Sequence, residues 1–158
     1  MISEKKINKF EITIGYIFKN KQLLINSLVH PSSFTDSKKN KIKVVNDFER
    51  LEFLGDRVLG LAISEIIYEK FIENNEGDLS KKLSYLVQKK FLHKISIDLK
   101  INDILNYSFK KNEKINVSIL ADSIESLIGS IYLDGGFANA KKFINKFWEP
   151  YFDLNEKN

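Results

Sequence analysis

Two acidic segments contain the residues best suited to chemistry in this sequence. The first, FERLEFLGDRVLG at residues 48–60, places Glu49, Glu52 and Asp56 in an otherwise largely apolar stretch. The second, SILADSIESLIGS at residues 118–130, carries Asp122 and Glu125 three positions apart. At about 100° per residue, the three carboxylates of the first segment fall within roughly 60° of one another on a helix. Each segment therefore predicts a helix with one acidic face.

A meeting of these two faces would create a site for divalent cations. Four carboxylates would then converge: Glu52, Asp56, Asp122 and Glu125. Unpaired carboxylates in one crevice repel each other, and a divalent cation removes that repulsion. All-oxygen ligation suits Mg²⁺ or Mn²⁺, and two such ions about 4 Å apart can activate water and stabilise a leaving oxygen. The alternative is a solvated acidic face on an ordinary amphipathic helix, which is the commoner case.

Apolar and small residues around the carboxylates favour a buried crevice. On the first helix, apolar residues also flank the acidic stripe, namely Phe53, Leu59 and Ile63. The opposite side is expected to be buried and carries Leu51, Leu54, Val58, Leu61 and Ala62. Small residues would let the two helices approach closely: Gly55, Gly60, Ser126 and Gly129. A glycine inside a helix costs roughly 1 kcal/mol relative to alanine, so a close approach would offset that cost.

The elements that must position these residues are all helical. Hydrophobic periodicity predicts helices at residues 19–30, 48–71, 79–99, 118–133 and 137–152. Asp78 or Ser80 is expected to cap the third of these helices, and Asp134–Gly136 should end the fourth. No alternating strand pattern of useful length is present. The fold class is therefore predicted as all-α, with a single domain over residues 1–158.

Composition narrows the chemistry further. The chain has 158 residues and no cysteine, which excludes disulfides and cysteine-bound metals and leaves oxygen ligands or His30 and His93. No apolar run is long enough to span a bilayer, so a cytoplasmic protein without membrane contact is expected. The net charge of +4 permits a polyanionic partner. Lysines gather at residues 38–43, 81–82, 89–90, 110–114 and 141–142, although a solvated lysine surface is the commoner reading of any one cluster.

The motifs resemble those of one enzyme family. ERLEFLGDRVLGL resembles the signature helix of bacterial ribonuclease III, and EGDLSKKLSYLV resembles the next helix of that family. SILADSIESLIGSIYLDGGF is similar to its second acidic helix, and IGYIFKNKQLLINSLVHPSSF to its N-terminal helices. The resemblance runs from about residue 14 to residue 152. It implies the ribonuclease III endonuclease-domain fold, a helical bundle that forms a homodimer.

This resemblance also implies an activity and a set of site residues. The family cleaves double-stranded RNA with Mg²⁺, or with Mn²⁺ as a substitute, in the processing of rRNA and mRNA. Its products carry 5′-phosphate and 3′-hydroxyl ends with short 3′ overhangs. By resemblance the metal ligands are Glu52, Asp56, Asp122 and Glu125, with Asp56 and Glu125 also catalytic. Glu49 and Glu76 match supporting or substrate-contacting positions, and Phe53 matches an aromatic that packs into the partner subunit. His30 and His93 are expected to cap or pack rather than catalyse.

Three departures from the family pattern leave alternatives open. No segment of the chain resembles the family's C-terminal double-stranded-RNA-binding domain. Residues 110–116 lack the glycine pair found in many members, which puts an RNA contact by that loop in doubt, and Arg57 follows the signature aspartate. One alternative is a catalytically inactive, RNA-binding or ribosome-associated relative; another is a compact member specialised for a structured ribosomal RNA. Inactive relatives typically lose a metal carboxylate, so the presence of all four favours the enzyme.

Overall fold

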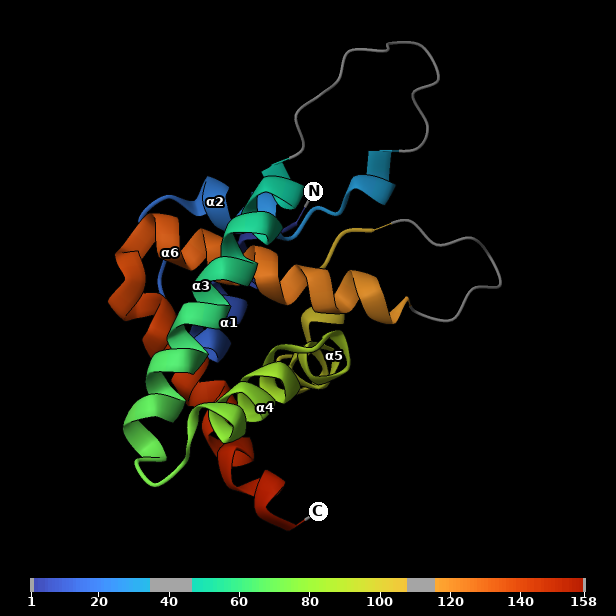
Figure 1. Ribbon diagram of the computed structural model, residues 1–158. Helices are drawn as coiled ribbons and strands as arrows, with labels where there is room; N and C mark the ends of the chain where they lie inside the picture. Colours follow the sequence, from blue (N-terminus) through green and yellow to red (C-terminus); the bar gives the residue numbers. More distant parts are fainter. Residues whose placement is uncertain (1, 35–46, 108–115, 158) are drawn as a thin grey trace.

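The computed structural model describes residues 2–34, 47–107 and 116–157, and these residues form an all-α protein (Figure 1), as predicted. The helices are α1 (Glu4–Ile14), α2 (Lys21–Ser27), α3 (Asp47–Lys70), α4 (Glu76–Val87), α5 (Lys89–Asp98) and α6 (Val117–Trp148). The described residues also form three 3-10 helices: η1 (Pro31–Phe34), η2 (Ile101–Asp103) and η3 (Glu149–Lys157). Among the described residues, extended pairing is limited to one bridge between Val29 and Asn106. No helix in the described ranges combines the length and apolarity needed to cross a membrane.

Helices α3 and α6 form the centre of the molecule, and the first half of α6 crosses α3 in Figure 1. The first half of α6 is buried nearly all round, as expected for a helix that is apolar on every side. Its fully buried apolar residues are Leu120, Ala121, Ile124, Leu127, Ile128 and Ile131. Helix α3 begins and ends one residue before its predicted bounds of 48 and 71. The prediction that these two acidic segments are helices is confirmed.

The two helices cross with their backbones in contact. A Cβ atom on Gly55 would lie 1.7 Å from the carbonyl oxygen of Glu125, and one on Gly129 would lie 2.2 Å from that of Leu51. Ser126 adds a hydrogen bond across the crossing, because its hydroxyl donates to the Phe48 carbonyl at 3.2 Å. The predicted close approach is therefore confirmed at these three positions. It is wrong at Gly60, where an added Cβ would meet nothing within 4 Å.

The single helix predicted at residues 79–99 is wrong, because the chain forms α4 and α5 there. The break lies at Gln88, whose backbone is extended at φ −68° and ψ 150°. Trp148 stabilises the end of α4, since its indole N–H donates to the Leu86 carbonyl at 2.9 Å, one of the carbonyls left without a partner at a helix end. The cap of α4 is also not Asp78 or Ser80. The side chain of Asn75 accepts the Asp78 N–H, so the helix begins at Glu76.

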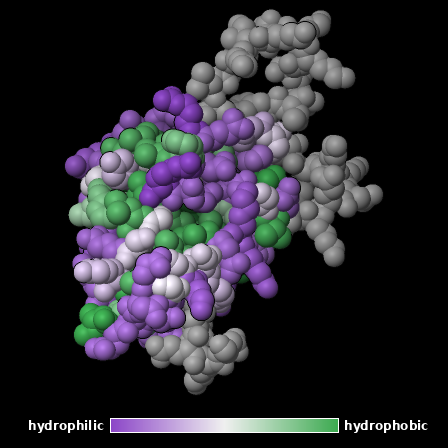
Figure 2. Space-filling model, in the orientation of Figure 1, coloured by the Kyte–Doolittle hydropathy of each residue, from purple (hydrophilic) through white to green (hydrophobic). Residues whose placement is uncertain are grey.

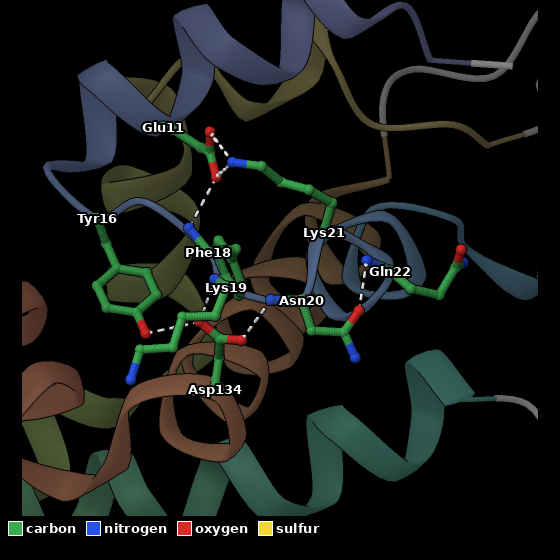
Figure 3. Close-up of polar contacts among 8 residues, drawn as sticks. All are labelled: Glu11, Tyr16, Phe18, Lys19, Asn20, Lys21, Gln22 and Asp134. Atoms are coloured by element: carbon green, nitrogen blue, oxygen red, sulfur yellow. Dashed lines mark hydrogen bonds and ion pairs between the residues drawn. The ribbon is translucent and has the colours of Figure 1, made fainter.

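Helix α6 bends at the predicted break, where Gly136 has φ 79° and ψ 177°. Asp134, just before the bend, binds the segment that joins α1 to α2 (Figure 3). Its carboxylate accepts the Tyr16 hydroxyl at 2.8 Å and the backbone N–H groups of Lys19 and Asn20 at 2.9 and 2.8 Å. Partial burial favours the neutral acid, but these hydrogen bonds prevail and lower the pKa of Asp134. The N-terminal helices are thereby anchored to α6.

A buried acid, Glu11, fixes the same segment from the α1 side. Glu11 is 3% exposed, accepts the Phe18 N–H at 2.8 Å and forms an ion pair with Lys21 (Figure 3). Asn20 then caps α2 by accepting the Gln22 N–H at 3.0 Å. Helix α2 is shorter than the helix predicted at residues 19–30, because the capped turn uses the residues before Lys21 and, beyond Ser27, Val29 pairs with Asn106 in a bridge.

Candidate active site

The α3–α6 crossing brings three of the four predicted metal ligands together. One carboxylate oxygen from each of Glu52, Asp122 and Glu125 lies within 4.8 Å of the others. The glycine contacts explain this arrangement: the carbonyl that approaches Gly55 belongs to Glu125 itself, so the helix surfaces carrying the acids face each other at the point of closest approach. The acidic faces predicted from the sequence therefore meet.

A cavity of about 510 Å³ opens over Glu52 and Glu125, two of the three clustered carboxylates. Its lining combines four acids, two cations and one aromatic ring: Glu49, Glu52, Asp56, Glu125, Arg57, Lys89 and Phe53. This volume is large enough for a phosphate group together with cations and their water, whereas the charged walls disfavour an apolar ligand.

Burial and like charge make Glu125 a weak acid. Its side chain lies at the base of the cluster, and the residue is 7% exposed. Burial, followed by the charges of Asp56, Glu52 and Asp122, raises the pKa of Glu125 to about 8, although Lys89 opposes this shift. The pKa of Glu52 is also raised, first by burial and then by Asp122. The site therefore favours an added positive charge, either a proton or a cation.

Asp56 lies at the rim of the cluster rather than within it. Its carboxylate is half exposed and forms an ion pair with Arg57 at 2.7 Å. The Arg57 guanidinium lies over the Phe53 ring, 4.0 Å from its centroid, and its Nη1 donates to the Phe53 carbonyl at 3.3 Å. The structure thus places Asp56 on the cavity wall, with its charge engaged by Arg57.

Lys89 is a site residue that the sequence analysis did not single out. Its Nζ atom lies 2.8 Å from Oδ1 of Asp122 and 3.1 Å from the Ser118 hydroxyl. That hydroxyl donates to the other oxygen of Asp122 at 3.2 Å. The hydrogen bond to Asp122 is the main cause of a raised pKa at Lys89, which keeps the ammonium charged. In the sequence, Lys89 was only one of a lysine pair inside a helix predicted to be continuous. Its position at the start of α5 could not be predicted without the break at Gln88.

The remaining predicted residues lie at different distances from the cluster. Glu49 is exposed and lines the cavity. Glu76 is the first residue of α4, where it accepts the Ser80 hydroxyl at 3.0 Å, and it is not among the described residues that line the cavity. His30 accepts the Ser32 N–H at 3.1 Å, and its ring packs edge-on against Phe48 with centroids 5.1 Å apart. This contact agrees with the packing role expected for His30.

Helix α3 also carries an exposed apolar stripe, formed by Phe53, Leu61 and Tyr68. These side chains are 62%, 61% and 73% exposed. Figure 2 shows apolar patches between hydrophilic residues on the face along which α3 runs in Figure 1. The expectation that Leu61 is buried is wrong, because α6 covers only one side of α3 and Leu61 lies away from it. The stripe begins at the cavity, since Phe53 also lines it.

Comparison with known proteins decides the family. A family model described as Ribonuclease-III-like matches residues 20–151, which is most of the chain. The chain belongs to the ribonuclease III family. Ribonuclease 3 of Wolbachia from Brugia malayi is 40% identical over 139 residues, covering 86% of this chain and 56% of that protein. Ribonuclease 3 of Campylobacter jejuni is 40% identical over 151 residues, covering 94% of this chain and 63% of that protein.

This member of the ribonuclease III family spans about three fifths of the length of those curated relatives. A structure of the nuclease domain of ribonuclease III from C. jejuni superposes with a TM-score of 0.79 at 40% identity, covering 94% of this chain and 97% of that one. Another study of that domain concerns flexibility in a region involved in its dimer formation. Dicer from Pichia stipitis matches with a TM-score of 0.66 at 28% identity, over 90% of this chain and 60% of that one.

Proposed function

We propose that this chain is a ribonuclease III nuclease domain that hydrolyses double-stranded RNA with the help of Mg²⁺, for which Mn²⁺ can substitute. The products would be 5′-phosphate and 3′-hydroxyl ends with short 3′ overhangs. The observation that carries the proposal is the convergence of Glu52, Asp122 and Glu125 from two helices beneath an open cavity, in a chain of this family. The natural role would be processing of rRNA and mRNA in the cytoplasm.

The side chains present fit a divalent cation. Glu125 is buried beside three other acids, and burial followed by their charges raises its pKa to about 8, so an added positive charge would be favoured there. Carboxylate oxygens are the ligands that Mg²⁺ and Mn²⁺ prefer. Glu52, Asp122 and Glu125 would hold the ion, and Asp56 would join them by turning away from Arg57. When bound, such an ion supplies Lewis acidity at the phosphate and lowers the pKa of water.

The chain's own residues would orient and neutralise the reacting groups. The rigid glycine crossing fixes the spacing between the carboxylates of α3 and α6, and this preorganisation avoids reorganisation during the reaction. Glu125 must release its proton before it can act as a ligand, so activity should rise with pH as that proton leaves. In this proposal Asp56 and Glu125 act most directly on the reaction, while Glu49 supports the substrate from the cavity wall. Glu76 would contact RNA outside the cavity.

A homodimer would provide two such sites for the two strands of one duplex. The apolar stripe of Phe53, Leu61 and Tyr68 supports this assembly, because exposed apolar side chains that share a helix face mark interaction surfaces. Lysines at residues 81–82 and 89–90 would attract the RNA phosphates, whereas Lys141 of the pair at 141–142 is engaged by Glu65 and Glu69. The clusters at residues 38–43 and 110–114, the second of which lies in the loop that lacks the glycine pair, are outside the described residues.

Cleavage of a long RNA duplex tests the proposal. Purified protein is incubated with the duplex and Mg²⁺ at low salt, because phosphate-driven binding weakens steeply as salt rises. Short duplexes with 5′-phosphate ends are expected from the wild type and none from Glu125→Gln, which keeps the fold but loses the ligand charge. Intact RNA that is nevertheless bound by folded wild-type protein would overturn the nuclease assignment and support the non-catalytic, RNA-binding alternative.

A further inference from the structure

The position of Lys89 is set by the break between α4 and α5. Gln88 is extended, so α5 begins directly after it and Lys89 becomes the first residue of the new helix. From there its side chain reaches the first turns of α6, where Ser118 and Asp122 lie. A continuous helix through residue 88 would point this lysine along a different direction. The contact is therefore a product of the fold rather than of a general lysine surface.

The contact occupies both oxygens of Asp122. The Lys89 ammonium lies 2.8 Å from Oδ1, and the Ser118 hydroxyl donates to Oδ2. The ammonium is held by Ser118 as well, at 3.1 Å. The Asp122 side chain is only 15% exposed, whereas that of Lys89 is 60% exposed. The carboxylate is thus held in place, while the lysine is free to leave into water without disturbing the core.

The Lys89 ammonium also lies close to the other carboxylates of the cluster. Asp122 shares the carboxylate cluster with Glu52 and Glu125, and Lys89 lines the cavity that opens over these two glutamates. Its charge acts on both glutamates, since it lowers pKa values that burial and the other acids raise. A divalent cation bound to Asp122 would compete with the Lys89 ammonium for the same carboxylate. The two positive charges would also repel each other.

We propose that Lys89 is a built-in counter-cation: its ammonium neutralises Asp122 in the metal-free protein and must leave Asp122 before a divalent ion binds there. This inference rests on the proposed function. Lys89 is in this sense a positioning residue, which keeps the acidic cluster compact without metal. It also sets the metal concentration at which the site fills. Removal of the Lys89 charge should destabilise the metal-free form and should stabilise the metal-bound form relative to it.

Metal binding without RNA tests this competition. Isothermal titration calorimetry with Mn²⁺ and with Mg²⁺ measures the metal dissociation constants of the wild type, Lys89→Met and Lys90→Met. Lys90 is the matched control, because it is the exposed neighbour with the same charge and forms no ion pair within the described part of the chain. Removing the competing ion pair should tighten metal binding by Lys89→Met about fivefold or more, whereas Lys90→Met should change it less than about twofold.

Thermal unfolding in EDTA provides a second measurement that needs no activity. Without metal, Lys89→Met should have a lower melting temperature than Lys90→Met. Added Mn²⁺ should raise the melting temperature of Lys89→Met by more than that of Lys90→Met. Lys89→Arg keeps the charge and should bind metal within about twofold of the wild type.

Equal or weaker metal binding by Lys89→Met relative to Lys90→Met would overturn the inference while leaving the nuclease proposal intact, provided the wild type binds metal and cleaves RNA. A wild type that neither binds metal nor cleaves would overturn both.

Discussion

Replacing Glu125 with glutamine should remove a large part of the pH dependence of stability in the metal-free protein. The pKa of Glu125 is raised from 4.5 to about 8, chiefly by burial and then by Asp56, Glu52 and Asp122. The folded state therefore holds a proton that the unfolded chain releases near pH 4.5. The stabilisation from this proton is fully present below about pH 4.5 and is lost as the pH rises through about 8. Glutamine imitates the protonated acid at every pH.

The magnitude follows from proton linkage. Between pH 5.5 and 7.5 the folded state retains the proton and the unfolded state does not, so the free energy of unfolding falls by about 1.4 kcal/mol per pH unit. This sums to about 2.7 kcal/mol over the interval. Because the cavity is open to water, screening reduces the effect, and we expect about 1–2 kcal/mol.

Urea unfolding followed by circular dichroism measures this difference. Wild type, Glu125→Gln and Glu49→Gln are unfolded in EDTA at pH 5.5 and 7.5 at one protein concentration, since association also stabilises the fold. Glu49→Gln is the control, because it removes an exposed carboxylate from the same cavity. Between pH 5.5 and 7.5, the free energy of unfolding should fall by about 1–2 kcal/mol more in the wild type and the control than in Glu125→Gln. Parallel losses in all three proteins would refute the assignment of a buried, protonated Glu125.

Two further predictions concern helix packing and assembly. Gly55→Ala should destabilise the fold by about 3 kcal/mol or more, because its Cβ would overlap the Glu125 carbonyl, whereas Gly60→Ala should leave stability unchanged or raise it by up to about 1 kcal/mol. Urea unfolding of the pair checks this, and equal stability of the two variants would contradict the backbone contact. Phe53→Ala should weaken the proposed homodimer by removing an exposed ring, as read by sedimentation velocity at low concentration. An unchanged dissociation constant would remove Phe53 from the interface.

Local regularities in the sequence were enough to predict much of the fold. The 3.6-residue period located α3 to within one residue at each end, and the glycines after Asp134 located the bend in α6. Both features depend on residues close together in the chain, which is why periodicity and backbone propensity detect them. The same reasoning placed Glu52 and Asp56 on one face of a helix and Asp122 and Glu125 on one face of another.

Sequence periodicity could not predict where helices end, or which faces are exposed, where tertiary contacts decide these features. The pattern at residues 79–99 suits one helix, yet Trp148 caps α4 from the far end of the chain and the backbone turns at Gln88. Leu61 has the pattern of a core residue, but no described segment of this chain covers its side of α3. In both cases the deciding contact, or its absence, involves residues far apart in sequence.

The sequence by itself determined which acids this protein presents and on which helix faces, because a side chain's direction on a helix follows from its position. Only the tertiary structure decided that three of them meet, that Asp56 lies at the rim beside Arg57, and that Lys89 reaches Asp122. The physical reason is steric: the contact of Gly55 with the Glu125 backbone fixes where α3 and α6 cross and so sets the spacing of their carboxylates, while the break at Gln88 sets where Lys89 begins α5.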